Sequence, residues 1–121
     1  MTINKTNYIA LLEKHKKISE LRDYFEQNIK DSRVSCEINR LRNVHVTITD
    51  KEGRLVGEYH FLNYNYFKTV NKKLKSDKIH IDDDTAHNLF IEYMTKTFPT
   101  YERDYLYELN EKGLDSQVDY Q

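Results

Sequence analysis

Side chains that bind metal ions crowd together at one place in this sequence, between residues 80 and 87. Histidine and aspartate are ligands that zinc and manganese use in proteins, and the segment holds His80, Asp83, Asp84 and His87. On a helix that begins near Asp83, the side chains of Asp83 and His87 would share one face, and His80 would approach from the residues before the helix. A metal-dependent enzyme centred on these residues is one hypothesis for the function.

The same segment has a second interpretation, as the start of a helix. Aspartate side chains at a helix start accept hydrogen bonds from free N–H groups and interact favourably with the positive end of the helix dipole. No H-x-x-x-H or C-x-x-C spacing accompanies the segment. We therefore favour the helix start and predict neither a metal nor a cofactor.

Other catalytic chemistry has little support in the sequence. It contains no glycine-rich phosphate loop, no G-x-S-x-G elbow and no H-E-x-x-H motif. The single cysteine, Cys36, alternates with Val34 and Ile38, which predicts a thiol on the buried face of a strand, where it is usually unreactive. One cysteine allows no internal disulfide, which fits a reducing compartment. We predict a protein that is not an enzyme.

The charges are unevenly distributed along the chain. Residues 1–78 hold 16 Lys+Arg and 10 Asp+Glu, a net charge of +6, whereas residues 79–121 hold 3 and 10, a net charge of −7. The two parts either neutralise each other within one fold or present surfaces of opposite sign to partners. The total charge of −1 conceals this difference.

A basic surface supports a nucleic-acid-binding hypothesis, because phosphate contact requires positive charge and nearby tyrosines such as Tyr64 and Tyr66 can stack on bases. Three lysines share one face of a predicted helix, and three arginines lie at or near predicted turns. These six residues are Arg40, Arg42, Arg54, Lys68, Lys72 and Lys75. Nucleic-acid binders usually have a basic composition, and this chain is nearly neutral, so nucleic acid is the alternative partner.

Tyrosine and acidic residues are interleaved in the last third of the chain. Tyrosine is enriched at protein interfaces, where it buries a rigid ring and keeps a hydroxyl for hydrogen bonding, and acidic residues steer a basic partner. The residues of this predicted surface are Tyr93, Tyr101, Glu102, Asp104, Tyr105, Glu108 and Glu111. The leading hypothesis is a small non-catalytic protein that binds a host or cognate protein with a basic surface.

The periodicity of apolar residues predicts the elements that position these side chains. Spacings of three and four predict a helix over residues 5–29, long enough for part of its apolar stripe to pair with a second copy of the protein, which makes a homodimer a further hypothesis. Alternation with period two then predicts three strands, at 34–38, 44–48 and 55–62. Between the second and third strands, Asp50 and Gly53 predict a tight hairpin turn.

Helical periodicity returns after the strands. Phe67, Val70 and Leu74 predict a short helix, and two more are predicted from residue 83 to 97 and from 101 to 113. The whole predicts an α+β fold with a long N-terminal helix, a three-stranded antiparallel meander and two to three C-terminal helices on one face of the sheet. We expect one domain over residues 1–113 and a flexible tail over 114–121.

Two further expectations come from composition. No run approaches the roughly 18 apolar residues of a membrane span, and the start of the chain lacks an apolar signal segment, so we expect a cytoplasmic protein with no membrane partner. Lys, Asn, Tyr and Ile supply 42 of the 121 residues. Because their codons are rich in A and T, a low-GC genome is favoured, and with it a phage- or plasmid-encoded inhibitor or regulator.

Overall fold

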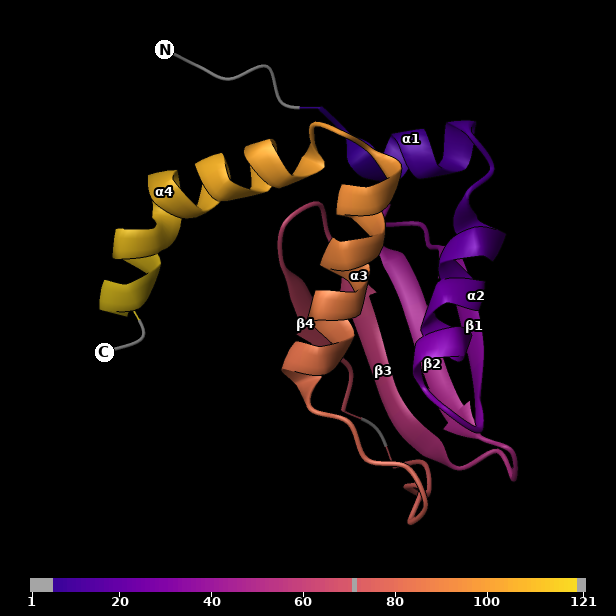
Figure 1. Ribbon diagram of the computed structural model, residues 1–121. Coiled ribbons are helices and arrows are strands. Elements are labelled where there is room, and N and C mark those ends of the chain that lie inside the picture. The colour runs from indigo at the N-terminus through magenta and orange to yellow at the C-terminus, as the bar shows by residue number, and fades with distance from the viewer. Residues whose placement is uncertain (1–5, 71, 120–121) are drawn as a thin grey trace.

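A four-stranded antiparallel sheet and four helices make up the fold in the computed structural model, which describes residues 6–70 and 72–119 and side chains as far as residue 111 (Figure 1). The predicted α+β class is confirmed. Among the described residues, no helix is both long enough and apolar enough to cross a membrane.

The N-terminal segment forms two helices, α1 (Tyr8–Lys14) and α2 (Ile18–Asn28), so the single helix predicted over residues 5–29 is wrong. The chain turns at Lys16, which has a positive φ of 55°. Residues 13–17 contain no apolar side chain, and this gap in the stripe is where the helix breaks. Tyr8, Ile9, Leu12, Leu21 and Phe25 of the two helices are buried in the core of the monomer, and Leu11 and Ile18 are partly buried against it.

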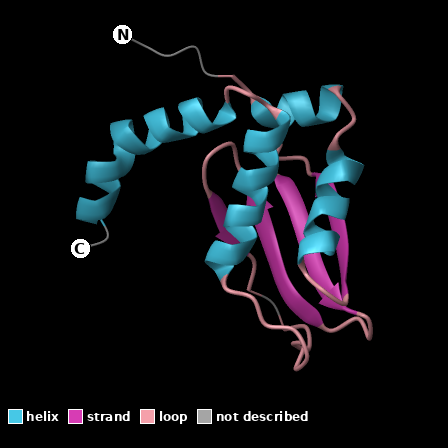
Figure 2. Ribbon diagram, in the orientation of Figure 1, coloured by secondary structure: helices cyan, strands magenta, loops and turns pink. Residues whose placement is uncertain are grey.

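The sheet is a meander with the strand order β1-β2-β3-β4. The strands are β1 (Ser32–Ile38), β2 (Val44–Asp50), β3 (Leu55–Phe61) and β4 (Tyr66–Lys68). In β2 and β3 every second residue is buried. This inner face packs against α2 and α3 (Asp83–Thr97), which lie side by side on it (Figure 2). The three predicted strands are confirmed.

The fourth strand replaces the helix that Phe67, Val70 and Leu74 predict. Residues 66–68 pair with the free edge of β3, with Tyr59 opposite Lys68, and the described residues of 69–82, which leave out residue 71, contain no helix. Phe67, Val70 and Leu74 are exposed rather than buried. Pairing with the sheet edge satisfies the backbone N–H and C=O groups, which outweighs a weak helical pattern of three residues.

The hairpin between β2 and β3 is confirmed, with Gly53 at φ 85° and its N–H donating to the Asp50 carbonyl. The Asp50 carboxylate also ties this turn to the loop that leads to α3. It accepts the Glu52 and Arg54 backbone N–H groups and the Ser76 hydroxyl, the last at 2.7 Å. The Ser76 hydroxyl bond is the main cause that lowers the pKa of Asp50.

The last two helices differ from the sequence prediction in one boundary. The helix predicted over residues 83–97 is confirmed as α3. The final helix, α4 (Tyr101–Asp119), continues past Gly113, where the sequence predicts its end. It leads away from the sheet and its covering helices (Figure 1). Residues 120 and 121 of the predicted tail lie outside the described residues.

Gly57 on β3 generates a prediction about stability. The Tyr59 ring lies over Gly57, and a Cβ added at Gly57 would lie 2.6 Å from the nearest ring carbon. The ring is fully buried, and its hydroxyl donates to Asp83 at the start of α3. We expect Gly57→Ala to lower the free energy of unfolding by about 1–3 kcal/mol, because the ring must shift within a packed core.

The measurement is urea denaturation of the wild type and of Gly57→Ala. Val56→Ala is the matched control, since Val56 is the neighbouring residue and is only half-buried on the other face. If Gly57→Ala is as stable as the wild type, the close approach of the Tyr59 ring does not constrain this position.

Candidate functional site

The face of the sheet opposite α2 and α3, here called the open face, carries polar and aromatic side chains. Its positions alternate with the buried ones, so each strand contributes half of its residues. On β2 and β3 these open-face residues are half-buried rather than fully exposed. Most of them are polar and lie outside the hydrophobic core, although Val56 packs partly against it.

Three aromatic rings stack across the open face. Antiparallel pairing places His45 of β2 opposite His60 of β3, and His60 opposite Phe67 of β4. The His45 and His60 rings are 4.4 Å apart and nearly parallel, and the His60 and Phe67 rings are 4.6 Å apart with a 6° angle between their planes. Directly opposed side chains lie close enough for such stacking, so the register places these rings side by side.

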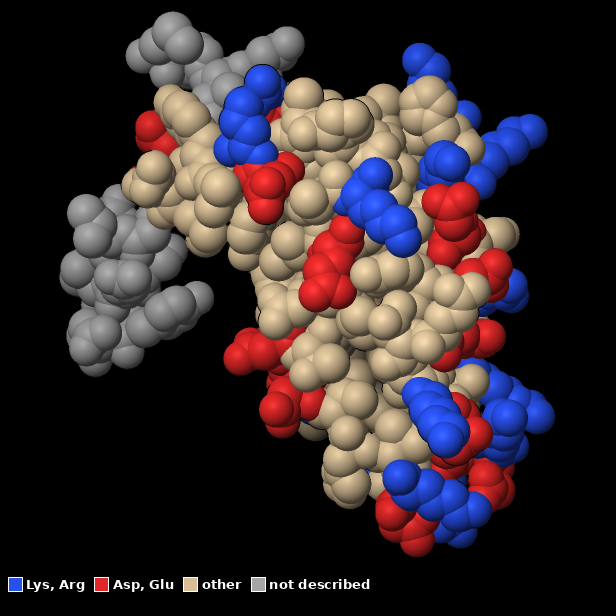
Figure 3. All heavy atoms as spheres, in the orientation of Figure 1, with Lys and Arg blue, Asp and Glu red and all other residues tan. Residues whose placement is uncertain are grey.

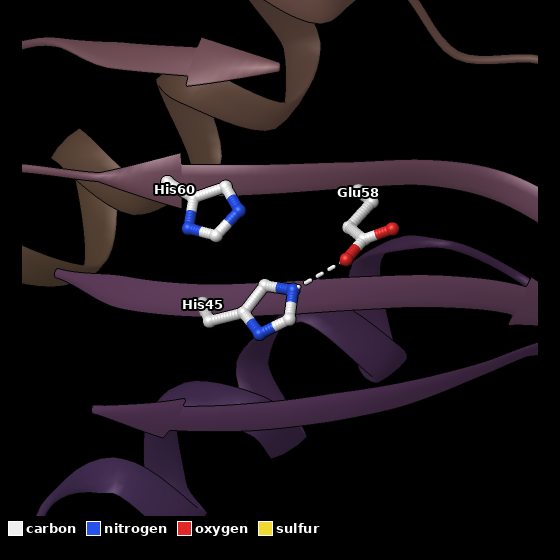
Figure 4. A group of neighbouring side chains, drawn as sticks. All are labelled: His45, Glu58 and His60. Carbon is white, nitrogen blue, oxygen red and sulfur yellow. Dashed lines mark hydrogen bonds and ion pairs between the residues drawn. The ribbon is translucent and has the colours of Figure 1, made fainter. Parts of the chain in front are cut away.

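Glu58 adds a carboxylate to this row of rings. It lies two residues before His60 on β3, and its Oε2 is 2.6 Å from His45 Nε2. Figure 4 shows the carboxylate beside the His45 ring, with one nitrogen of each imidazole on the side of Glu58. One potential ligand atom from each of His45, Glu58 and His60 lies within 4.8 Å of the other two.

Further side chains contact the ring nitrogens of both histidines. Glu37 on β1 has a carboxylate oxygen 3.6 Å from His45 Nδ1. The Asn39 amide nitrogen is 3.3 Å from His60 Nδ1, and the Thr69 hydroxyl is 2.8 Å from His60 Nε2. Burial, followed by the neighbouring His45, lowers the pKa of His60, which favours the neutral imidazole. The two rings are therefore fixed in orientation from both edges.

The candidate metal ligands between residues 80 and 87 are not brought together in the fold. His80 is exposed in the loop before α3, while His87 points among Phe61, Tyr66 and Tyr105. Asp83 accepts the Tyr59 hydroxyl and pairs with Lys68 at 3.1 Å. Among the described residues, only His45, Glu58 and His60 bring three ligand atoms within 4.8 Å of one another.

The segment from residue 82 is instead a helix start, as we favoured, although the side chain of the N-cap residue Asp82 makes no capping hydrogen bond. Asp82 is the N-cap of α3, and its carbonyl accepts the Thr85 and Ala86 N–H groups. Asp83 and Asp84 lie in the first turn, where acidic side chains interact favourably with the helix dipole.

The residues of the predicted acidic, tyrosine-rich surface do not form one surface, because some are buried and others are exposed. Tyr93 and Tyr101 are buried, and their hydroxyls donate to Glu20 and to the Asn63 carbonyl. Asp104 and Glu108 are buried too, and Asp104 accepts the Tyr8 hydroxyl. These four side chains support α3 and α4 and lie too deep for a partner to reach. Glu102 and Glu111 are exposed, and Tyr105 is half-buried.

The outward side of α4 carries apolar side chains instead. Leu106, Tyr107 and Leu109 have exposed fractions of 54%, 37% and 47%. In an amphipathic helix of a globular protein, leucines normally face the core. Here tyrosines and acids occupy the inner side, and the leucines face solvent.

The predicted basic surface is largely paired with acidic groups. Lys68 pairs with Asp83, Arg42 with Glu13, and the Arg54 guanidinium is 3.9 Å from Asp77. Arg40, Lys72 and Lys75 are on turns and loops, not on one face of a helix. At the lower end of Figure 3, basic and acidic side chains are interspersed. The basic residues within 1–78 thus pair with acidic residues from both 1–78 and 79–121.

Cys36 on β1 packs against the core from the inner side of the sheet. Burial raises the pKa of its thiol to about 12. A thiol with such a pKa remains protonated near neutral pH and is a poor nucleophile.

We compared the chain with family models, with curated proteins and with solved structures, and nothing matched it. The candidate sites therefore rest on the geometry of this chain.

The burial of His87 generates a prediction about pH. Its Nε2 is buried without a hydrogen-bond partner, and burial lowers the pKa of the ring, an effect that Asp84 partly offsets. A group whose pKa is lower in the folded state stabilises the fold fully above its unfolded pKa of 6.5, and this contribution is lost as the pH falls through the folded value.

We expect His87→Phe to keep the ring contacts and to remove this acid-dependent loss. The measurement is the urea midpoint of wild type and variant at pH 7.5 and at pH 5, and the wild type should lose more stability between them. His60, whose pKa is also lowered, is present in both proteins and cancels in the comparison. An equal loss in both proteins would show that His87 does not contribute.

Proposed function

We propose that this protein binds another protein through the outward side of α4. The observation that carries the proposal is the solvent exposure of Leu106, Tyr107 and Leu109 on a helix that leads away from the sheet (Figure 1). Exposed apolar side chains grouped on one element are typical of protein interfaces. An α-helix binds in this way by laying its apolar side into a groove on its partner.

The inner side of α4 supports the proposal because it holds the helix in place. The Tyr101 hydroxyl donates to the Asn63 carbonyl, and the Tyr8 hydroxyl donates to Asp104. The Tyr101 ring packs edge-on against Tyr8 at 4.9 Å. Two segments far from α4 in sequence, around Tyr8 and Asn63, thus fix its first turns. A surface that is rigid before binding loses less conformational entropy on binding.

The charge of α4 indicates what kind of partner fits. Residues 101–111 contain four acidic side chains and one arginine, and Glu102 and Glu111 are exposed. Acidic side chains around an apolar contact complement a basic rim. We therefore propose a partner protein with an apolar groove bordered by lysine or arginine. The codon bias favours, within this proposal, an inhibitor or regulator of a host protein.

The test is a pair of substitutions on the outward side. We expect Leu106→Glu combined with Leu109→Glu to weaken binding of the purified partner at least about tenfold, because two apolar contacts are lost and charge is buried. The partner is first identified by affinity purification from the native host with a nuclease-treated control. Binding is then measured by titration calorimetry.

Leu41→Glu is the matched control, because Leu41 is a 78% exposed leucine in the turn between β1 and β2. It should bind like the wild type, and all variants should keep the wild-type circular dichroism spectrum. Unchanged binding by the double variant, or capture that nuclease abolishes, contradicts the proposal.

A further inference from the structure

We infer that His45, Glu58 and His60 on the open face form a binding site for a zinc ion. This inference is independent of the proposed interface on α4. It starts from the three ligand atoms, which lie within 4.8 Å of one another. Zinc sites are built from imidazole nitrogens and carboxylate oxygens, and a site with three protein ligands leaves a fourth position for water or substrate.

The distances suit an ion of this size. Zinc binds nitrogen and oxygen at about 2.0–2.2 Å, so two ligands of a tetrahedral site are about 3.4 Å apart. The His45–Glu58 contact of 2.6 Å is shorter than this, and 4.8 Å is the upper bound for the set. To direct one nitrogen each at the ion, the two rings must turn out of their nearly parallel stack, a rotation of half-buried side chains that needs no change in the strands.

The positions on the sheet also favour coordination. Glu58 and His60 are two residues apart on β3 and project from the same face, and His45 lies directly opposite His60 on β2. Figure 4 shows a nitrogen of each ring on the side of Glu58. Two neighbouring strands of a rigid sheet thus supply all three ligands, which reduces the entropy lost when the ion binds.

The side chains around the ligands match those that orient metal-bound histidines. A histidine that binds metal through Nε2 usually donates its Nδ1–H to a carboxylate, which fixes the ring. The Glu37 carboxylate is 3.6 Å from His45 Nδ1, on the edge of the ring away from Glu58. The Asn39 amide is at the corresponding edge of His60.

Loading with zinc changes the positions of protons. In the metal-free protein His45 Nε2 shares a hydrogen bond with Glu58. When the ion takes that position the ring carries its proton on Nδ1, beside Glu37, so that the ligand is a neutral imidazole. To bind zinc through Nε2, His60 gives up its contact with the Thr69 hydroxyl and carries its ring proton on Nδ1, beside the Asn39 side chain. Neutral imidazoles and an ionised carboxylate are the ligand forms that result.

Other ions fit less well. Magnesium and calcium select oxygen ligands, and two of the three ligands here are imidazoles. No thiolate takes part, because Cys36 packs toward the opposite face of the sheet. Copper and nickel bind the same ligand types as zinc. We name zinc because it is the member of this group without redox chemistry.

The experiment titrates the full-length, tag-free chain with zinc chloride in a calorimeter after treatment with chelator. We expect one zinc per chain. Cobalt should give the absorption bands of a four-coordinate site. Magnesium chloride should give no binding.

The variants keep the ring stack while removing ligands. His60→Phe preserves stacking with Phe67 and removes both nitrogens, and Glu58→Gln removes the charge. We expect each of three variants to weaken zinc binding at least about 100-fold: His60→Phe, Glu58→Gln and His45→Phe. His80→Ala is the control, because His80 is an exposed histidine outside the site, and its affinity should equal that of the wild type.

The inference is overturned if the wild type binds no stoichiometric zinc. It is equally overturned if His45→Phe and His60→Phe, with wild-type circular dichroism, keep their affinity, or if His80→Ala loses it. Either result with the variants would mean that zinc binds elsewhere on the chain.

Discussion

The fold depends on the burial of one face of the antiparallel sheet. Because side chains alternate along a strand, the residues that face α2 and α3 must be apolar, while their neighbours on the open face are free of that demand. The inner residues of β2 and β3 are buried at every second position. This requirement fixes the register, since a slip by one residue would turn Glu58 and His60 into the core.

The same register creates the site on the open face. His45, His60 and Phe67 stack because antiparallel pairing sets them opposite one another, and Glu58 follows from its place two residues before His60. Holding three polar ligands close together costs conformational entropy. The strands that carry them are already ordered by the burial of the inner face, so the ligands need little further ordering. A cluster of this kind needs no loop to assemble, which makes its geometry precise.

The packing near the end of the chain decides which side chains of α4 face solvent. The core beside α3 and α4 is built from tyrosines, and their hydroxyls require partners when they are buried. Tyr8 and Tyr93 find carboxylates in Asp104 and Glu20. Acidic and aromatic residues are thereby drawn inward, and Leu106 and Leu109 remain on the outward side of α4. The surface suited to a partner is thus an apolar one.

The sequence by itself determined the α+β class, the three longer strands, the hairpin at Gly53 and the helix over 83–97. All of these are encoded in local periodicity and turn chemistry. Only the tertiary structure decided that His45 meets Glu58 and His60, because residues 13 or more apart become neighbours through strand pairing. It also decided that residues 66–68 extend the sheet, and that the tyrosines of α4 face inward. Each of these outcomes depends on a contact between distant segments, and local spacing carries no record of such contacts.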